Sequence, residues 1–154
     1  MSLAFDVLAT CRAKGLTVAT AESCTGGMVA VALTDVAGSS DVFICGFVTY
    51  SNAAKIDMLG VSDATLDAHG AVSEQVAGQM AEGTLARSKA TLAISITGIA
   101  GPGPSGHKPE GRVCFGLAKA GHSTHVETVE FGALGRAQVR TAARDHALEI
   151  LLRG

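Results

Sequence analysis

Hydrophobic and polar positions follow two different periods along this chain, which predict a mixture of helices and strands. Leu3, Val7, Leu8 and Cys11 recur at the spacing of one helix face, and Gly15 follows them as a stop signal. Short apolar runs rich in β-branched residues predict strands between the helices. The predicted helices span 3–14, 28–33, 52–58, 63–68, 73–89 and 135–154, and the predicted strands span 16–21, 42–50, 91–97, 112–119 and 124–131.

The order of these elements predicts the fold class, an α/β protein with a three-layer α/β/α sandwich around a mixed, mostly parallel five-stranded sheet. Helices between the first three strands indicate parallel crossovers. The turn at 120–123 joins the last two strands as a hairpin, which indicates one antiparallel strand. Because no internal repeat or long linker divides the chain, we expect a single domain over residues 1–154.

Composition and charge disfavour several classes of protein. The net charge of −2 argues against a nucleic-acid binder, which normally presents a strongly basic face. The longest near-continuous apolar stretch, 26–33, is far shorter than the roughly 20 residues that span a bilayer. The first residues lack the basic start of a secretion signal, so we expect a soluble, cytoplasmic protein. The four cysteines form no C-x-x-C pair, and no metal site is expected.

Glycine-rich turns follow two of the predicted strands, those at 16–21 and 91–97. Ligands of open α/β sheets bind at the carboxyl ends of strands, so two such turns predict a ligand crevice if the strands are neighbours. The first turn matches neither the Walker A pattern nor the dinucleotide-binding G-x-G-x-x-G pattern. It places Ser23, Cys24 and Thr25 beside a helix N-terminus, where free N–H groups favour negative charge. On the pattern alone Ser23 is a nucleophile or, more often, a helix cap, and Cys24 is a packed thiol.

Four motifs of the chain, taken together, resemble the CinA C-terminal domain family. They are Ala-Glu-Ser-Cys-Thr-Gly-Gly at 21–27, Gly-Phe-Val-Thr-Tyr-Ser-Asn at 46–52 with Lys55, His-Gly-Ala-Val-Ser-Glu at 69–74 and Thr-Gly-Ile-Ala-Gly-Pro at 97–102. Known members of that family are nicotinamide-nucleotide amidases. They hydrolyse the carboxamide of nicotinamide mononucleotide (NMN) to nicotinate mononucleotide and ammonia, and the resemblance implies no cofactor. Larger members carry a further N-terminal domain, so the resemblance implies the stand-alone form here.

The resemblance also implies roles for individual residues. Ser23 would be the nucleophile and Lys55 its base, with Tyr50 beside them in the site. Lys55 must be neutral to accept a proton, so its pKa must lie well below the ordinary value of about 10.4. Its spacing alone would make it an ordinary solvated helix lysine. The residues implied in substrate binding are Cys24, Thr25, Gly26, Gly27, Thr97, Gly98, Ile99, Ala100 and Gly101.

Three arginines recur every four residues on the last predicted helix: Arg136, Arg140 and Arg144. A cation is expected to meet the phosphate of NMN, and the first turns of a helix favour an anion. Such a stripe is usually a solvated face, but of the three we favour Arg140 as a phosphate contact or a support of the site. The chain departs from the family pattern nearby, at Glu110, where many members have valine, and near Ala133, where many have an aspartate.

Two other functions remain open on the sequence. One is a non-catalytic nucleotide-binding or regulatory module linked to competence or DNA damage. The other is an amidase of a different small carboxamide. Ammonia release from NMN, compared with release from its dephosphorylated nucleoside, would separate these possibilities. Small domains of this kind commonly pair, so we also expect a homodimer.

Overall fold

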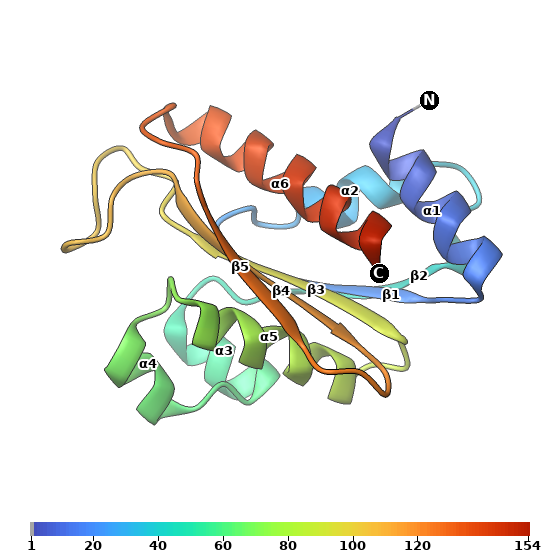
Figure 1. The fold of residues 1–154 in the computed structure, drawn as a ribbon, viewed down its shortest axis with the longest axis horizontal. Coiled ribbons are helices and arrows are strands. Elements are labelled where there is room, and N and C mark those ends of the chain that lie inside the picture. The colour runs from blue at the N-terminus through green and yellow to red at the C-terminus, as the bar shows by residue number, and fades with distance from the viewer. Residues whose placement is uncertain (1) are drawn as a thin grey trace.

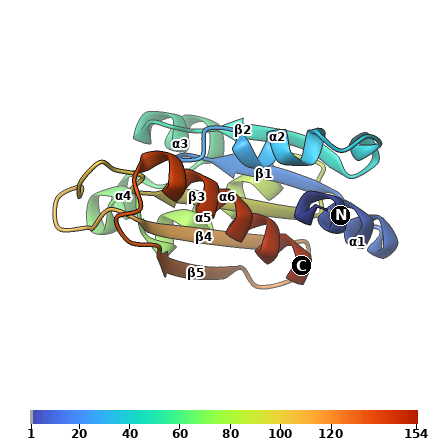
Figure 2. The same ribbon diagram turned by 90° about the horizontal axis from the view of Figure 1, so that it is seen from above.

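The computed structural model describes residues 2–154 and contains all the predicted helices and strands (Figures 1 and 2). The helices are α1 (Leu3–Lys14), α2 (Met28–Thr34), α3 (Asn52–Leu59), α4 (Asp63–His69), α5 (Glu74–Ala86) and α6 (Arg136–Arg153). The strands are β1 (Val18–Glu22), β2 (Phe43–Val48), β3 (Leu92–Gly98), β4 (Arg112–Lys119) and β5 (His125–Glu130). A 3₁₀ turn, η1 (Ser39–Asp41), precedes β2 and lies outside the predicted helices and strands.

Most elements begin or end one to three residues from the predicted bounds, and hydrogen bonds explain two of these differences. Helix α5 ends at Ala86 rather than residue 89, and the Ser88 hydroxyl accepts a hydrogen bond from Ala90 N at 3.3 Å. Such local bonds compete with continuation of a helix. Strand β1 extends one residue further than predicted because the carbonyl of Glu22 accepts from Thr49 N at 3.0 Å.

The five strands form one sheet in the order β2-β1-β3-β4-β5. The pairs β1–β2 and β1–β3 are parallel, and the pairs β3–β4 and β4–β5 are antiparallel. Only β4 therefore runs against the other strands, which confirms the predicted mixed, mostly parallel sheet. From β1 the chain continues to β2, which lies on one side of the β1–β3 pair in the sheet, and from β3 it continues to β4, which lies on the other side. This divergence opens a crevice at the adjacent carboxyl ends of β1 and β3.

Helices cover both faces of the sheet, as Figure 1 shows. Helices α1, α2 and α6 lie on one face, and α3, α4 and α5 lie on the other. The first face buries apolar side chains such as Leu8, Leu33 and Ile150, whereas the second buries Met80 and Leu59. The predicted three-layer sandwich is thus confirmed. Among the described residues, none of the helices combines the length and the apolar character needed to span a bilayer.

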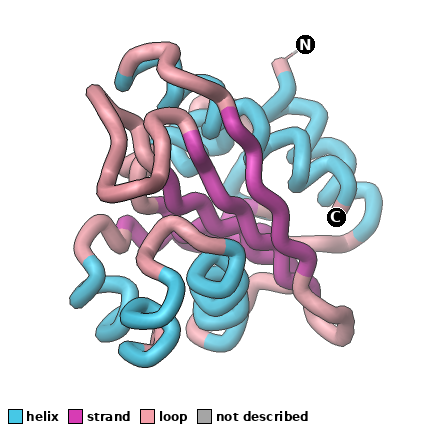
Figure 3. The backbone as a smooth tube through the Cα atoms, turned by 60° about the vertical axis from the view of Figure 1, so that its left-hand side comes forward, coloured by secondary structure: helices cyan, strands magenta, loops and turns pink. Residues whose placement is uncertain are grey.

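The long loop between β3 and β4 projects from one end of the sheet (Figure 3). The first turn of α6 lies at the same end, because Arg136 Nη1 donates a hydrogen bond to Gly101 O in that loop at 2.6 Å. Segments that are far apart in the sequence therefore meet where β1 and β3 end.

Candidate active site

The turn between β1 and α2 is held by a buried carboxylate, that of Glu22. Its Oε1 accepts from Thr25 Oγ1 at 2.7 Å and from Val29 N at 2.9 Å, and its Oε2 accepts from Ala30 N at 3.0 Å. These bonds satisfy free N–H groups at the start of α2, whose N-cap residue is Gly27 and offers no side chain. The carboxylate thereby fixes the tight turn that contains Ser23.

Ser23 and Lys55 meet in this turn although 32 residues separate them in the sequence. Lys55 Nζ lies 3.1 Å from Ser23 Oγ and donates a hydrogen bond to Tyr50 O at 3.0 Å. Ser23 Oγ lies 3.4 Å from the same carbonyl. Helix α3 brings the lysine to this position because Ser51 caps it, accepting from Ala54 N at 3.0 Å. The structure therefore brings together the serine and the lysine that we singled out.

Lys55 is buried, with only 1% of the residue exposed. Within residues 2–154 it forms no ion pair with a carboxylate. Burial disfavours an ammonium ion and lowers the pKa of Lys55 below its ordinary value, although a charged Cys24 would raise it. Burial also raises the pKa of Cys24 to about 11, so near neutral pH that residue is an uncharged thiol. Among the described residues, no carboxylate is therefore paired with Lys55 to keep it protonated.

A cavity of about 390 Å³ opens beside this pair. A volume of this size falls within the range of roughly 300–1,000 Å³ typical of small-molecule sites. The predicted site residues that line it are Ser23, Cys24, Tyr50, Lys55, Thr97, Gly98, Ile99, Ala100 and Gly101. The two glycine-rich turns, one after β1 and one after β3, therefore face one crevice.

Four predicted binding residues do not line the cavity: Thr25, Gly26, Gly27 and Arg140. Thr25 is fully buried, and its hydroxyl donates to Glu22. Arg140 lies behind the turn, where its guanidinium donates to Cys24 O at 3.0 Å and to Thr25 O at 3.4 Å. Of the two roles that we considered for Arg140, the geometry matches support of the site, and a phosphate contact would have to come from another cation.

The cation at the rim of the cavity is Arg136, one helical turn before Arg140. Its Nη1 donates to Gly101 O at 2.6 Å, and its Nη2 donates to Tyr50 Oη at 2.9 Å. The sequence contained the signal, a stripe of three arginines. It did not reveal which one enters the cavity, because that depends on where α6 begins and how it crosses the sheet.

The sequence alone assigns no role to two acidic residues at the site, Glu22 and Glu110. Glu22 belongs to the motif at 21–27, and its carboxylate accepts hydrogen bonds from the N–H groups of Val29 and Ala30 at the start of α2. Glu110 accepts from Gly103 N at 2.7 Å, in the loop that lines the cavity. No group of three His, Cys, Asp or Glu side chains that could hold a metal ion occurs in the part of the chain that the structure describes.

The fold and the site together define a class of protein: a doubly wound α/β sandwich with a buried serine–lysine pair in a cavity where the strand order diverges. The chain belongs to a known family of this kind, described as the CinA C-terminal domain, whose profile matches residues 1–154. This confirms the resemblance that the four motifs indicated.

Several relatives are similar over nearly the whole chain. A protein from Enterobacter agglomerans named nicotinamide-nucleotide amidohydrolase PncC is 50% identical, covering 98% of this chain and 92% of its own length. The protein of the same name from Escherichia coli is 49% identical over the same shares. A CinA-like protein from Chloroherpeton thalassium is 49% identical over 91% of this chain, which spans only 35% of that relative. The chain thus spans about a third of the length of some curated relatives.

Solved structures are similar as well. The crystal structure of competence/damage inducible protein CihA from Agrobacterium tumefaciens superimposes with a TM-score of 0.94 at 48% identity, covering 99% of this chain and 94% of that one. The competence damage-inducible protein A from Klebsiella pneumoniae also reaches a TM-score of 0.94, at 36% identity over 98% and 93% of the two chains.

Proposed function

We propose that this protein is a nicotinamide-nucleotide amidase, which hydrolyses the carboxamide of NMN to nicotinate mononucleotide and ammonia. The observation that carries the proposal is the 3.1 Å approach of Lys55 Nζ to Ser23 Oγ within the cavity. The printed names of the two PncC relatives, which are similar over 98% of this chain, support the choice of substrate.

In the proposed reaction, Ser23 Oγ attacks the carboxamide carbon while neutral Lys55 accepts the proton of the serine hydroxyl. The resulting tetrahedral intermediate loses ammonia, which takes a proton from the Lys55 ammonium ion, and an ester with Ser23 remains. Water then attacks the ester, again with Lys55 as base, to release the carboxylate and restore the serine. The Tyr50 carbonyl, 3.0 Å from Lys55 Nζ, holds the amine in place throughout.

A backbone N–H group of the turn after β1 is the proposed donor to the negative oxygen of the intermediate. Gly26 and Gly27, which the resemblance implies in substrate binding, do not line the cavity, and Gly26 N already donates to Ser23 O at 3.0 Å. Cys24 lies directly after the nucleophile and lines the cavity, and its amide donates to no backbone carbonyl among the described residues. The Cys24 amide is therefore the better-placed donor.

Arg136 is the proposed contact for the phosphate of NMN. It lines the cavity, and its present partners, Gly101 O and Tyr50 Oη, are uncharged acceptors. A phosphate offers a guanidinium stronger, charge-assisted hydrogen bonds than these acceptors do. The Tyr50 ring lies at the same rim, where it can pack against the pyridine ring of the substrate.

The test is ammonia release by the purified protein from NMN and from nicotinamide riboside, which lacks the phosphate. We expect release from NMN, and a fall of about 10³-fold or more in kcat for Ser23→Ala, because the hydroxyl is the attacking group. Ser123→Ala, in the exposed hairpin between β4 and β5, is the matched control and should keep wild-type activity.

Other outcomes identify the competing functions. Binding of NMN without release of ammonia would favour the regulatory module linked to competence or DNA damage. Equal turnover of nicotinamide riboside would indicate an amidase that does not require the phosphate. Turnover of NMN by Ser23→Ala at the wild-type rate would exclude Ser23 as the nucleophile.

The expected homodimer and a place in pyridine nucleotide recycling stay predictions. Strand β2 is an edge of the sheet, and its Ile44 and Val48 are exposed apolar side chains. An unpaired edge of this kind is a template for pairing with a second strand, which supports the expectation of a dimer.

A further inference from the structure

The carboxylate of Glu110 joins two walls of the cavity that come from different parts of the chain. Its Oε1 accepts a hydrogen bond from Gly103 N at 2.7 Å, and its Oε2 accepts one from Gly135 N at 3.0 Å. Gly103 belongs to the loop that lines the cavity, and Gly135 directly precedes Arg136 at the rim. One side chain therefore fixes the loop and the start of α6 relative to each other.

The loop has few other attachments near the cavity. Among the described residues, the segment 100–104 makes only one other hydrogen bond, in which Arg136 Nη1 donates to Gly101 O. A Cβ atom on Gly101 would lie 2.5 Å from the carboxyl carbon of Glu110, so the loop backbone packs directly against this carboxylate. Both attachments thus lead to α6, one directly and one through Glu110.

A carboxylate beside a phosphate-binding cavity should by charge alone weaken the binding of a nucleotide. Both oxygens of Glu110, however, are occupied by backbone N–H groups, and bonds to a charged acceptor are about twice as strong as neutral ones. Removal of the carboxylate should therefore weaken nucleotide binding if Glu110 positions the loop, and should strengthen it if only its charge matters. The sign of the change in KM separates the two roles.

We infer that Glu110 is a positioning residue that, through the amides of Gly103 and Gly135, sets the separation between the loop and Arg136 and so the affinity for the nucleotide. The inference rests on the proposed function, in which Arg136 contacts the phosphate. Glu110 acts through these neighbours and takes no part in the chemical step.

Two variants remove the attachment to different degrees. Glu110→Gln keeps the size but turns an NH₂ group toward one of the two N–H donors, so one bond is lost, and Glu110→Ala loses both. We expect the KM for NMN to rise about threefold in Glu110→Gln and about tenfold in Glu110→Ala, with kcat within about threefold of wild type. A role of charge alone predicts a lower KM in both variants.

Glu130→Gln is the matched control. It removes the same charge near the same end of the sheet, but the Glu130 carboxylate pairs with Arg112 Nε at 3.0 Å and, among the described residues, accepts no hydrogen bond from the segment 100–104. Its KM for NMN should equal that of the wild type. Amide hydrogen exchange supplies a second readout, and exchange at Gly103 and Gly135 should be about tenfold faster in Glu110→Ala.

Faster exchange at both glycines together with a raised KM supports the inference. An unchanged or lowered KM overturns it, and so does a raised KM with unchanged exchange, because the effect would not pass through the loop. A wild-type protein that releases no ammonia from NMN overturns the proposed function instead. The exchange rates and the dissociation constant of NMN then decide the role of Glu110 by the same criteria.

Discussion

At the scale of single residues, Lys55 is the most informative side chain. It is buried beside a hydroxyl and a carbonyl, and neither group compensates an ammonium charge. Transfer of an unpaired charge from water into a protein interior is costly, and a buried lysine responds by losing its proton. In the proposed function, the burial that lowers the pKa of Lys55 is what would allow it to act as the base for the neighbouring serine.

Replacement of Lys55 by arginine tests whether this residue is the base for Ser23. A guanidinium keeps the positive charge but does not release its proton in a protein, so Lys55→Arg should lose about 10²–10⁴-fold in kcat. In the wild type, kcat/KM should rise with pH as Lys55 loses its proton, in a range below the ordinary lysine pKa of about 10.4.

Steady-state kinetics from acid to alkaline pH check both statements. Lys89→Arg, the same exchange on an exposed turn after α5, should leave the rate and its pH dependence unchanged. Near-normal turnover by Lys55→Arg would rule out the lysine as the base.

At the scale of elements, the contact between α5 and α3 positions the lysine. A Cβ atom on Gly83 of α5 would lie 1.9 Å from Leu59 O, the carbonyl of the last residue of α3. Only glycine permits this approach, and Lys55 stands one helical turn before Leu59. The packing of α5 therefore sets the height of α3 above the sheet and, with it, the place of the amine.

Gly83→Ala should destabilise the protein by about 2 kcal/mol, because overpacking against backbone outweighs the roughly 1 kcal/mol that alanine gains in helix propensity. The melting temperature should fall by about 4–8 °C. Displacement of α3 should also lower kcat.

Gly78→Ala, in the same helix, is the comparison. Its Cβ atom would meet only the side chain of Val126, at 3.2 Å, so the neighbour can shift and stability should change little. Urea unfolding of the two variants measures the difference. Equal midpoints would contradict the proposed close packing of α5 on α3.

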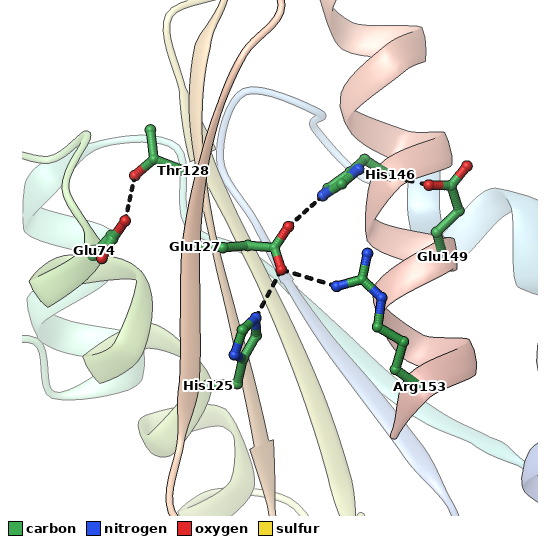
Figure 4. Close-up of polar contacts among 7 residues, drawn as sticks. All are labelled: Glu74, His125, Glu127, Thr128, His146, Glu149 and Arg153. Atoms are coloured by element: carbon green, nitrogen blue, oxygen red, sulfur yellow. Dashed lines mark hydrogen bonds and ion pairs between the residues drawn. The ribbon is translucent and has the colours of Figure 1, made fainter.

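At the scale of the whole molecule, α6 and the edge strand β5 connect the site to the opposite end of the sheet. The first turn of α6 carries Arg136, and its second half meets β5 at Glu127 (Figure 4). Glu127 Oε2 lies 2.6 Å from His146 Nε2, and Glu127 Oε1 lies 2.7 Å from His125 Nε2 and accepts from Arg153 Nη1 at 3.0 Å.

The next residue of β5 points to the opposite face, where the Thr128 hydroxyl donates to Glu74 at the start of α5 (Figure 4). Successive side chains thus attach this edge strand to both helical layers.

Stability in acid tests this connection. Burial alone would raise the pKa of Glu127, but hydrogen bonds from His125, His146 and Arg153 outweigh it and hold the pKa at about 2. Because this value lies below that of an unfolded glutamate, about 4.3, the contribution is present above that pH and is lost as the pH falls toward 2.

Allowing for its partial exposure, Glu127→Gln should lower the free energy of unfolding by about 1 kcal/mol at pH 7, and the difference should vanish near pH 2–3. Urea titrations at both pH values measure it. Glu149→Gln, whose carboxylate lies at 3.6 Å from His146 Nδ1 and is largely exposed, should have a much smaller effect. A pH-independent difference for Glu127→Gln would contradict the assigned ion pairs.

The sequence by itself determined the elements and their order. The hydrophobic period, β-branched runs and a stop signal such as Gly15 are local properties, and they predicted each helix and strand with small errors at the ends. Two glycine-rich turns after strands predicted the crevice, and the motifs predicted many of the residues that line it, although Thr25, Gly26 and Gly27 do not.

Only the tertiary structure decided how distant residues combine. No spacing rule in the sequence predicts the contact between Ser23 and Lys55. It depends on the parallel pairing of β1 with β2 and on the position of α3, which follows β2. Arg136 rather than Arg140 lines the cavity because of where α6 begins and the direction in which it runs. The hydrogen bonds of Glu110 depend on the irregular loop between β3 and β4, whose conformation hydrophobic periodicity does not predict. Such contacts arise from packing of elements against one another, which neighbouring residues in the sequence do not encode.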